Sequence, residues 1–252
     1  MNATLSGKIA VVTGATGGIG SAICHALANE GATLVAGYHQ SESKANSLVS
    51  SLAGSSVEGH FAVAMPVTDS AALRDAVSVI LQKVPRVDIL VNCVGTTRFV
   101  PHADLDSLDD DLIDEILRVN VRGVYSTIRA FRETLASSGA GLIVNISSIA
   151  AQTAMGSNVM YCASKAAVEN MTRSLGRALA PRIRVVAVAP GLIDTDFVKS
   201  MDVEWRNQQA QSTPLGRLTR ATEVADAVLA VAALLRHTTG TTVAVDGGRP
   251  LR

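Results

Sequence analysis

The sequence has few aromatic residues, few charges and few cysteines. Aromatic side chains make up 3% of the 252 residues and charged ones 17%, with 22 basic and 22 acidic side chains. This balance favours neither nucleic acid nor an anionic membrane as a partner, so we expect a small molecule as the ligand. The three cysteines, Cys24, Cys93 and Cys162, are widely spaced and form no CxxC pair. That spacing argues against a disulfide framework or a zinc site, and we expect reduced thiols and no metal.

Long apolar stretches are also missing. No segment reaches the roughly 18 consecutive apolar residues of a membrane span, and the first residues, MNATLSGKIAVVTG, lack the basic and apolar regions of a signal peptide. We therefore expect a soluble, cytoplasmic protein. There is no repeat at solenoid spacing and no linker between domains. One domain spanning residues 1–252 is expected at this length.

Seven short runs rich in β-branched residues alternate with segments of helical periodicity. The runs are continuously apolar, which is typical of strands buried on both faces. Helices on either side of a parallel sheet provide that burial. The predicted fold is therefore α/β, a single-domain Rossmann fold with a doubly wound, seven-stranded parallel sheet and helices on both faces. The predicted strands are 8–14, 32–38, 57–65, 87–93, 141–147, 183–190 and 241–248, and the predicted helices are 18–30, 41–53, 69–83, 107–137, 158–179 and 221–235.

A glycine-rich turn, TGATGGIG at 13–20, joins the first predicted strand to the first helix. Gly14, Gly18 and Gly20 let the backbone turn tightly and approach a ligand closely. The N-terminus of the following helix offers unpaired N–H groups and a favourable dipole to a pyrophosphate. This position in the fold indicates a dinucleotide site, although a glycine turn alone also serves ordinary connections.

Tyr161 and Lys165 lie four positions apart in a predicted helix, so their side chains project from the same face. A free phenol, with a pKa of ~10, holds its proton firmly at neutral pH. A neighbouring ammonium favours the phenolate, and we expect Lys165 to make Tyr161 an effective proton donor and acceptor. The pair predicts acid–base chemistry on a carbonyl or hydroxyl group.

Seven segments in register resemble the short-chain dehydrogenases/reductases. They are TGATGGIG (13–20), LVNCVG (90–95), Asn120 in LRVNVRG, NISS (145–148), Tyr161-x-x-x-Lys165, APGLIDTD (189–196) and VDGG (245–248). The resemblance covers nearly the whole chain and is greatest to bacterial ketoreductases of the β-ketoacyl type. It implies an NAD(P)-dependent oxidoreductase that transfers a hydride between nicotinamide and a ketone or secondary alcohol.

The resemblance also implies which residues act. Tyr161 is the expected general acid/base, Ser148 binds the substrate oxygen, and Asn120 holds a water that links Lys165 to solvent. Lys165 is also expected to bind the nicotinamide ribose. The full set of expected cofactor contacts is Gly14, Thr16, Gly18, Ile19, Gly20, Tyr38, His39, Val67, Asn92, Gly95, Tyr161, Lys165, Pro190, Gly191, Ile193 and Thr195.

NADP(H) is favoured as the cofactor, with NAD(H) as the alternative. A carboxylate at the end of the second strand would bind a ribose 2′-OH and repel a 2′-phosphate. The segment Gly37 to Gln40 contains none, and His39 or Ser41 is available to a phosphate. Against NADP, no arginine lies there, and Gly17 stands where many NADP-preferring relatives carry a basic residue.

The identity of the substrate, the direction of the reaction and the oligomeric state stay open. A small ketone or free β-keto compound is slightly preferred to an acyl-carrier thioester, because residues 135–142 carry no basic side chain for an acidic carrier protein. A segment at about 194–216 is expected to be a substrate lid, with an amphipathic helix as the alternative. The family resemblance implies a homotetramer, with a dimer next.

Three other functions are compatible with parts of the sequence. A non-catalytic dinucleotide sensor would not need the Tyr161 and Lys165 pair. An NAD-dependent alcohol dehydrogenase would use the same residues in the oxidative direction. A sugar-nucleotide epimerase would need a substantial C-terminal substrate domain, for which the residues after Lys165 leave little room.

Overall fold

The computed structural model describes residues 4–53, 59–194 and 202–251. Within them lies one parallel sheet of seven strands in the order β3-β2-β1-β4-β5-β6-β7. The fold prediction is confirmed. The strands are β1 (Ile9–Thr13), β2 (Thr33–Tyr38), β3 (Phe61–Ala64), β4 (Ile89–Asn92), β5 (Gly141–Ile146), β6 (Ile183–Pro190) and β7 (Thr241–Val245).

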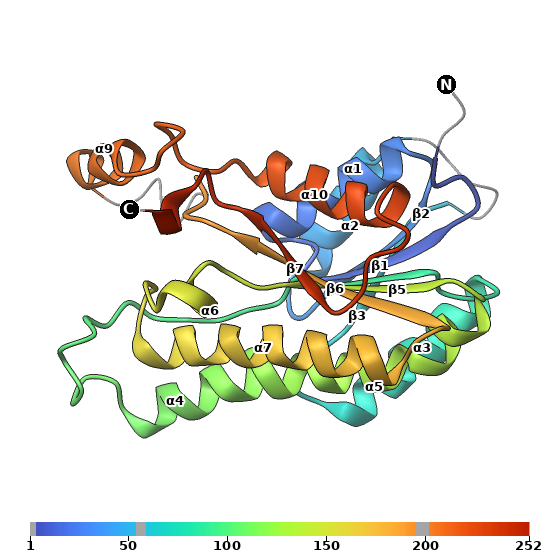
Figure 1. Cartoon of the computed structure of the whole chain (residues 1–252). Coiled ribbons are helices and arrows are strands. Elements are labelled where there is room, and N and C mark those ends of the chain that lie inside the picture. Colours follow the sequence, from blue (N-terminus) through green and yellow to red (C-terminus); the bar gives the residue numbers. More distant parts are fainter. Residues whose placement is uncertain (1–3, 54–58, 195–201, 252) are drawn as a thin grey trace.

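Helices cover both faces of the sheet (Figure 1). On one face lie α1 (Gly18–Asn29), α2 (Glu42–Ser51) and α10 (Ala221–Ala233), and on the other lie α3 (Ser70–Lys83), α4 (Asp110–Leu117), α5 (Val124–Ser137) and α7 (Val159–Ala178). Neighbours in one strand therefore face different layers. Val12 packs into the core on the α1 face and Val11 into the core on the α5 face, and neither is exposed. This two-sided burial is why the strands read as continuous apolar runs.

The order of strands reverses between β1 and β4, which places two loops side by side at the carboxyl edge of the sheet. Thr13 at the end of β1 pairs with Asn92 at the end of β4, and Asn92 in turn pairs with Asn145 of β5. A Cβ on Gly14 would lie 3.0 Å from the carbonyl oxygen of Cys93, so the two loops are in contact. Ligands of open α/β sheets bind at such a reversal point.

The predicted helix 107–137 is wrong in two respects. It begins at Asp110, because the Asp109 carboxylate accepts the Leu112 N–H at 2.8 Å and caps the helix. It is also interrupted by a π-helical turn, η1 (Arg118–Gly123), between α4 and α5. Close packing accompanies this turn, since a Cβ on Gly123 would lie 2.9 Å from Val67 Cγ2. The turn contains Asn120.

Two short helices among the described residues were not predicted, α6 (Ala150–Thr153) and the one-turn helix η2 (Arg249–Leu251). Both are too short for a hydrophobic period to be read from the sequence. A third short helix, α9 (Val203–Gln211), lies in the segment for which a helix was the alternative to a lid. None of the helices within 4–53, 59–194 and 202–251 combines the length and apolar character that a membrane crossing requires.

Candidate active site

The turn after β1 leaves the N-terminus of α1 open to a ligand. Gly17 caps the helix without a side-chain hydrogen bond, and the first turn holds no acidic residue. Gly14 has a φ of +63°, and a Cβ on Gly20 would collide with the Gly14 carbonyl oxygen, so this geometry requires glycine at both positions. Uncapped N–H groups at a positive helix end fit a pyrophosphate. The expected contacts Thr16, Gly18 and Ile19 lie in this turn or the first turn of α1.

Tyr161 and Lys165 lie together on α7, as their spacing predicts. The Lys165 Nζ is 5.7 Å from the centroid of the Tyr161 ring. Lys165 is buried, and its Nζ donates a 2.9 Å hydrogen bond to the Ile146 carbonyl at the end of β5. A Cβ on Gly156 would lie 3.1 Å from Tyr161 Cδ1, so the turn before α7 packs tightly against the phenol ring. The cation and the phenol are thus held in one site at the carboxyl edge of the sheet.

Asn158 fixes the start of the helix that carries this pair. It is fully buried, and its Oδ1 caps α7 by accepting the Tyr161 N–H at 2.7 Å. Its Nδ2 donates to Thr97 Oγ1 at 3.2 Å and to the Arg98 carbonyl at 2.8 Å. The residue therefore joins the β4–α4 loop to the helix that carries Tyr161 and Lys165. An Asn at a predicted helix start is a recognisable capping signal in the sequence. The bonds of its Nδ2 to Thr97 and Arg98 could not be predicted from the sequence.

Ser148 lies two residues beyond β5, at the same edge. Its Oγ accepts the Ala150 N–H at 3.2 Å, and its carbonyl accepts the Ala151 N–H at 3.0 Å. These bonds turn the chain directly into α6. None of the hydrogen bonds found within the described residues uses the hydroxyl hydrogen of Ser148, which is therefore available for a substrate oxygen. Ser147 is turned the other way and is buried against α7.

Asn120 lies beside the Tyr161 and Lys165 site, but its amide is occupied by protein groups. Its Oδ1 accepts the Thr96 N–H at 2.8 Å, and its Nδ2 donates to the Thr96 carbonyl at 3.0 Å and to Ser164 Oγ at 3.1 Å. A Cβ on Gly95 would lie 3.6 Å from both Asn120 Oδ1 and Lys165 Nζ. The two polar atoms therefore converge on Gly95, an expected cofactor contact. Ser164, between the two catalytic candidates, was missed because its position in the helix carries no distinguishing signal.

Two of the expected cofactor contacts have side chains directed into the protein. The Asn92 Nδ2 donates to Asn145 Oδ1 at 2.9 Å, inside the sheet, and its own Oδ1 has no partner among the described residues. Val67 is buried against Gly123 of η1. Only the backbones of these two residues are left to face a dinucleotide at the sheet edge.

Tyr38 and His39 lie at the end of β2, where the adenosine ribose is expected. His39 is exposed. The Tyr38 hydroxyl interacts with Glu42, and desolvation together with this carboxylate raises the pKa of Tyr38. Glu42 was not considered at the sequence level, because it follows the strand end by four residues. It brings a negative charge close to the ribose position.

The turn after β6 joins two parts of the site. The Pro190 carbonyl accepts the Ile149 N–H at 3.0 Å, next to Ser148, and the Gly191 N–H donates to Val245 of β7 at 3.0 Å. Ile193 is buried and forms an isolated bridge with Thr219. Thr195 and the part of the expected lid from there to residue 201 lie outside the described residues. The described remainder contains α9, none of whose residues is buried, and Arg206 on this helix pairs with Asp194 at 2.8 Å. The choice between a lid and a packed amphipathic helix stays a prediction.

All three cysteines are free thiols. Burial raises the pKa of Cys93 to about 12, although Lys165 acts in the opposite direction. Burial also raises the pKa of Cys24 to about 12, with a smaller contribution from Cys93. These two thiols stay protonated near neutral pH and are poor nucleophiles there.

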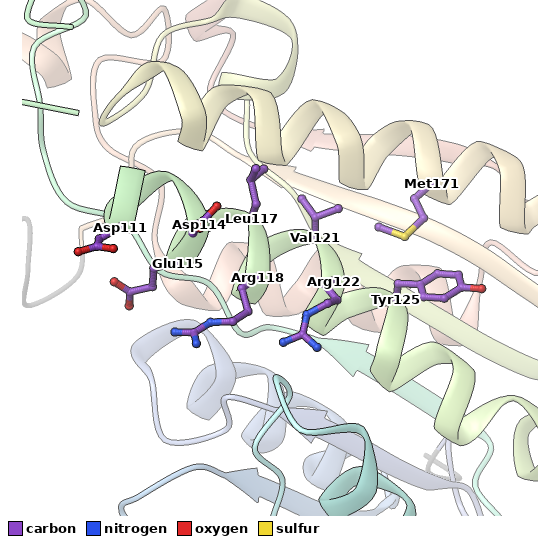
Figure 2. Close-up of a pocket in the computed structure, with 9 residues that line it drawn as sticks. All are labelled: Asp111, Asp114, Glu115, Leu117, Arg118, Val121, Arg122, Tyr125 and Met171. Atoms are coloured by element: carbon purple, nitrogen blue, oxygen red, sulfur yellow. The ribbon is translucent and has the colours of Figure 1, made fainter. Parts of the chain in front are cut away.

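A cavity of about 1090 Å³ lies on α4, η1, α5 and α7 (Figure 2). None of the four expected catalytic residues lines it. Its wall has acidic side chains at the α4 end, two arginines on η1, and apolar side chains beside them. The lining residues are Asp111, Asp114, Glu115, Leu117, Arg118, Val121, Arg122, Tyr125 and Met171.

Comparison with known proteins identifies the family. Residues 8–205 match the short chain dehydrogenase family. The 3-oxoacyl-(acyl-carrier-protein) reductase FabG of Thermotoga maritima is 35% identical over 248 residues, 97% of this chain and 98% of that protein. The crystal structure of a gluconate 5-dehydrogenase from Burkholderia cenocepacia J2315, in complex with NADP and tartrate, has a TM-score of 0.89 at 28% identity and covers all of this chain and 98% of its own. The chain therefore belongs to the short-chain dehydrogenase/reductase family of oxidoreductases.

Proposed function

We propose that the protein is an NADP(H)-dependent carbonyl or β-ketoacyl-type reductase with Tyr161 as its general acid/base. The observation that carries this proposal is the placement of Lys165 Nζ 5.7 Å from the Tyr161 ring centroid, at the sheet edge that also holds Ser148. The open N-terminus of α1 beside this edge suits the dinucleotide pyrophosphate. Oxidation of a secondary alcohol uses the same residues in reverse.

The protein's own groups supply the proton and the orientation. A nicotinamide bound at this edge would supply the hydride for the carbonyl carbon. The Tyr161 hydroxyl donates its proton to the carbonyl oxygen, and the Ser148 hydroxyl donates a hydrogen bond to the same oxygen as charge develops. Lys165 stabilises the phenolate that Tyr161 becomes. Asn120 holds the backbone of Thr96 in place, and we propose that it also binds a water beside Lys165.

The choice of NADP(H) over NAD(H) is supported by the residues at the end of β2. Gly37, Tyr38, His39 and Gln40 include no carboxylate that would select a ribose 2′-OH. His39 is exposed and available to a 2′-phosphate. Glu42 opposes this preference by its charge, and we expect it to moderate the discrimination rather than reverse it.

We propose a small ketone or a free β-keto compound as the substrate in preference to a thioester on a carrier protein. An acidic carrier needs exposed basic side chains near the cleft. Residues 135–142 carry none, but the structure places them at the amino end of β5, away from the edge that holds Ser148. Nearer that edge, Arg98 is paired with Asp109 at 3.0 Å and Arg206 with Asp194 at 2.8 Å. We also propose that the segment 194–216 is a substrate lid. Because the three cysteines are free thiols, we propose a cytoplasmic location.

Turnover with a panel of carbonyl compounds tests the proposed function. We expect the purified protein to oxidise NADPH in the presence of small ketones or β-keto esters, with a higher kcat/KM than with NADH. The loss of absorbance of the reduced nicotinamide measures this directly. Dinucleotide binding without turnover of any ketone or alcohol would contradict the proposal and favour the sensor. A higher kcat/KM with NADH would contradict only the cofactor assignment.

We further propose a homotetramer, with the cavity of Figure 2 at one of its interfaces. Its carboxylates lie at the α4 end and Arg118 and Arg122 on the next turn, so two copies paired in opposite directions place acidic groups against basic ones. We expect light scattering to report four times the 26.1 kDa chain mass. Arg118→Glu should shift the protein toward smaller species. A monomeric wild type would overturn the proposal, and a dimer would restrict it to this one interface.

A further inference from the structure

Glu169 is a buried carboxylate close to the proposed catalytic residues, and no step described so far uses it. It lies on α7, four residues after Lys165 and eight after Tyr161, so the three share one face of the helix. The residue is 2% exposed. A buried carboxylate is unfavourable unless donors surround it, so the donors that approach it indicate what it holds.

Three donors reach the carboxylate, and two come from the segment that carries Ser148. The Ser147 hydroxyl lies 3.3 Å from Glu169 Oε1 and 3.4 Å from the Lys165 carbonyl. The Gln152 Nε2, on α6, donates to Oε2 at 3.2 Å. The third donor, Arg173, lies 3.5 Å from the same Oε2, one turn further along α7, with its side chain 56% exposed.

This arrangement brackets Ser148. Ser147 precedes it and Gln152 follows it, and both are bound to one carboxylate on the helix that carries Tyr161 and Lys165. The Ser148 Oγ is itself bound to the first residue of α6 through Ala150 N–H. Any displacement of α6 relative to α7 therefore changes where the Ser148 hydroxyl points.

We propose that Glu169 is a positioning residue, which holds the segment 147–152 against α7 and so sets the Ser148 hydroxyl relative to Tyr161. The proposal rests on the proposed function, because it assigns Ser148 and Tyr161 to one reaction. Glu169 touches no substrate and transfers no proton. Glu169 affects the position of Ser148 through its hydrogen bonds with Gln152 and Ser147. Arg173 contributes only an ion pair on the solvent side of the carboxylate.

A pair of variants separates positioning from general stability. Gln152→Ala and Arg173→Met each remove one donor from the same oxygen, and both side chains are accessible enough for the fold to survive. We expect Gln152→Ala to lower kcat by about tenfold, since small misplacements of catalytic groups are costly. NADPH affinity should be unchanged, and the deuterium isotope effect from 4-deuterated NADPH should rise as hydride transfer becomes slower. Arg173→Met should stay within about twofold of wild type, as for exposed ion pairs generally.

Hydrogen exchange provides a readout that does not depend on turnover. Exchange of the amides of residues 148–154 should accelerate in Gln152→Ala and not in Arg173→Met. Unchanged exchange in Gln152→Ala would overturn the proposal, as would equal kcat values for the two variants. If the wild type reduces no carbonyl compound, the proposed function fails, and accelerated exchange still supports the hold of Glu169 on this segment.

Discussion

Tyr161→Phe is expected to lower kcat for carbonyl reduction by about a thousandfold, the loss that follows removal of a general acid. The substitution deletes only the hydroxyl. The ring remains packed against Gly156, and the cap from Asn158 to the Tyr161 N–H is a backbone contact that the change does not touch. We therefore expect the thermal unfolding midpoint and the dissociation constant for NADPH to stay close to those of the wild type. Steady-state absorbance assays and a fluorescence titration with NADPH measure the two effects separately.

Tyr125→Phe is the matched control for this change. Tyr125 lies on α5, 46% exposed, and its hydroxyl is not part of the proposed site. The control protein should keep kcat near the wild-type value. If Tyr161→Phe also kept full turnover, the proton would have to come from another group, and the role assigned to the tyrosine would be wrong.

Lys165→Met is expected to damage binding and chemistry together. Methionine keeps most of the length of the side chain but removes the charge beside the phenol and the 2.9 Å hydrogen bond to the Ile146 carbonyl. We expect kcat to fall by about 10³-fold, as when a key electrostatic donor is lost. The dissociation constant for NADPH should rise by about tenfold, the effect of losing one charge-assisted hydrogen bond.

A second lysine distinguishes this result from a general effect of charge removal. Lys83→Met removes an exposed ammonium at the end of α3, where Nζ lies over the Phe61 ring at 4.9 Å, and should leave both constants unchanged. Equal losses of kcat and of NADPH affinity in both variants would indicate a general effect of charge removal. The melting temperatures of the two variants show whether a loss of activity comes from unfolding. A folded Lys165→Met enzyme with normal kcat would contradict the assigned role.

The architecture could be predicted from the sequence because its signals are strong and repeated. The central strands are apolar on both faces, and the major helices have a clear period, so their alternation indicates a parallel sheet. The short helices α6 and α9 lack such signals. The interruption of the long helix at η1 is accompanied by close packing of Gly123 against Val67, a contact between distant segments that no local pattern encodes.

The site could be predicted in part for a similar reason. Tyr161 and Lys165 meet because four residues make about one helical turn, and the glycines of the first turn sit at a position defined by the strand before them. The contacts of Glu169 with Ser147 and Gln152 arise only when α6 folds back on α7. In the sequence Glu169 reads as an ordinary polar residue of an amphipathic helix, and only its burial sets it apart.

The strand connectivity of the sheet also affects how the chain folds. In β1, Ile9 pairs with Thr33 and Val11 with Leu90, so one edge of this strand is completed early during synthesis and the other waits for β4. Parallel strands joined by long crossovers give a high contact order, which slows folding. Before β4 emerges from the ribosome, the unpaired backbone N–H and C=O groups on that edge of β1 are open to wrong pairing. The nascent protein is therefore most exposed to aggregation before the two halves of the dinucleotide cleft have met.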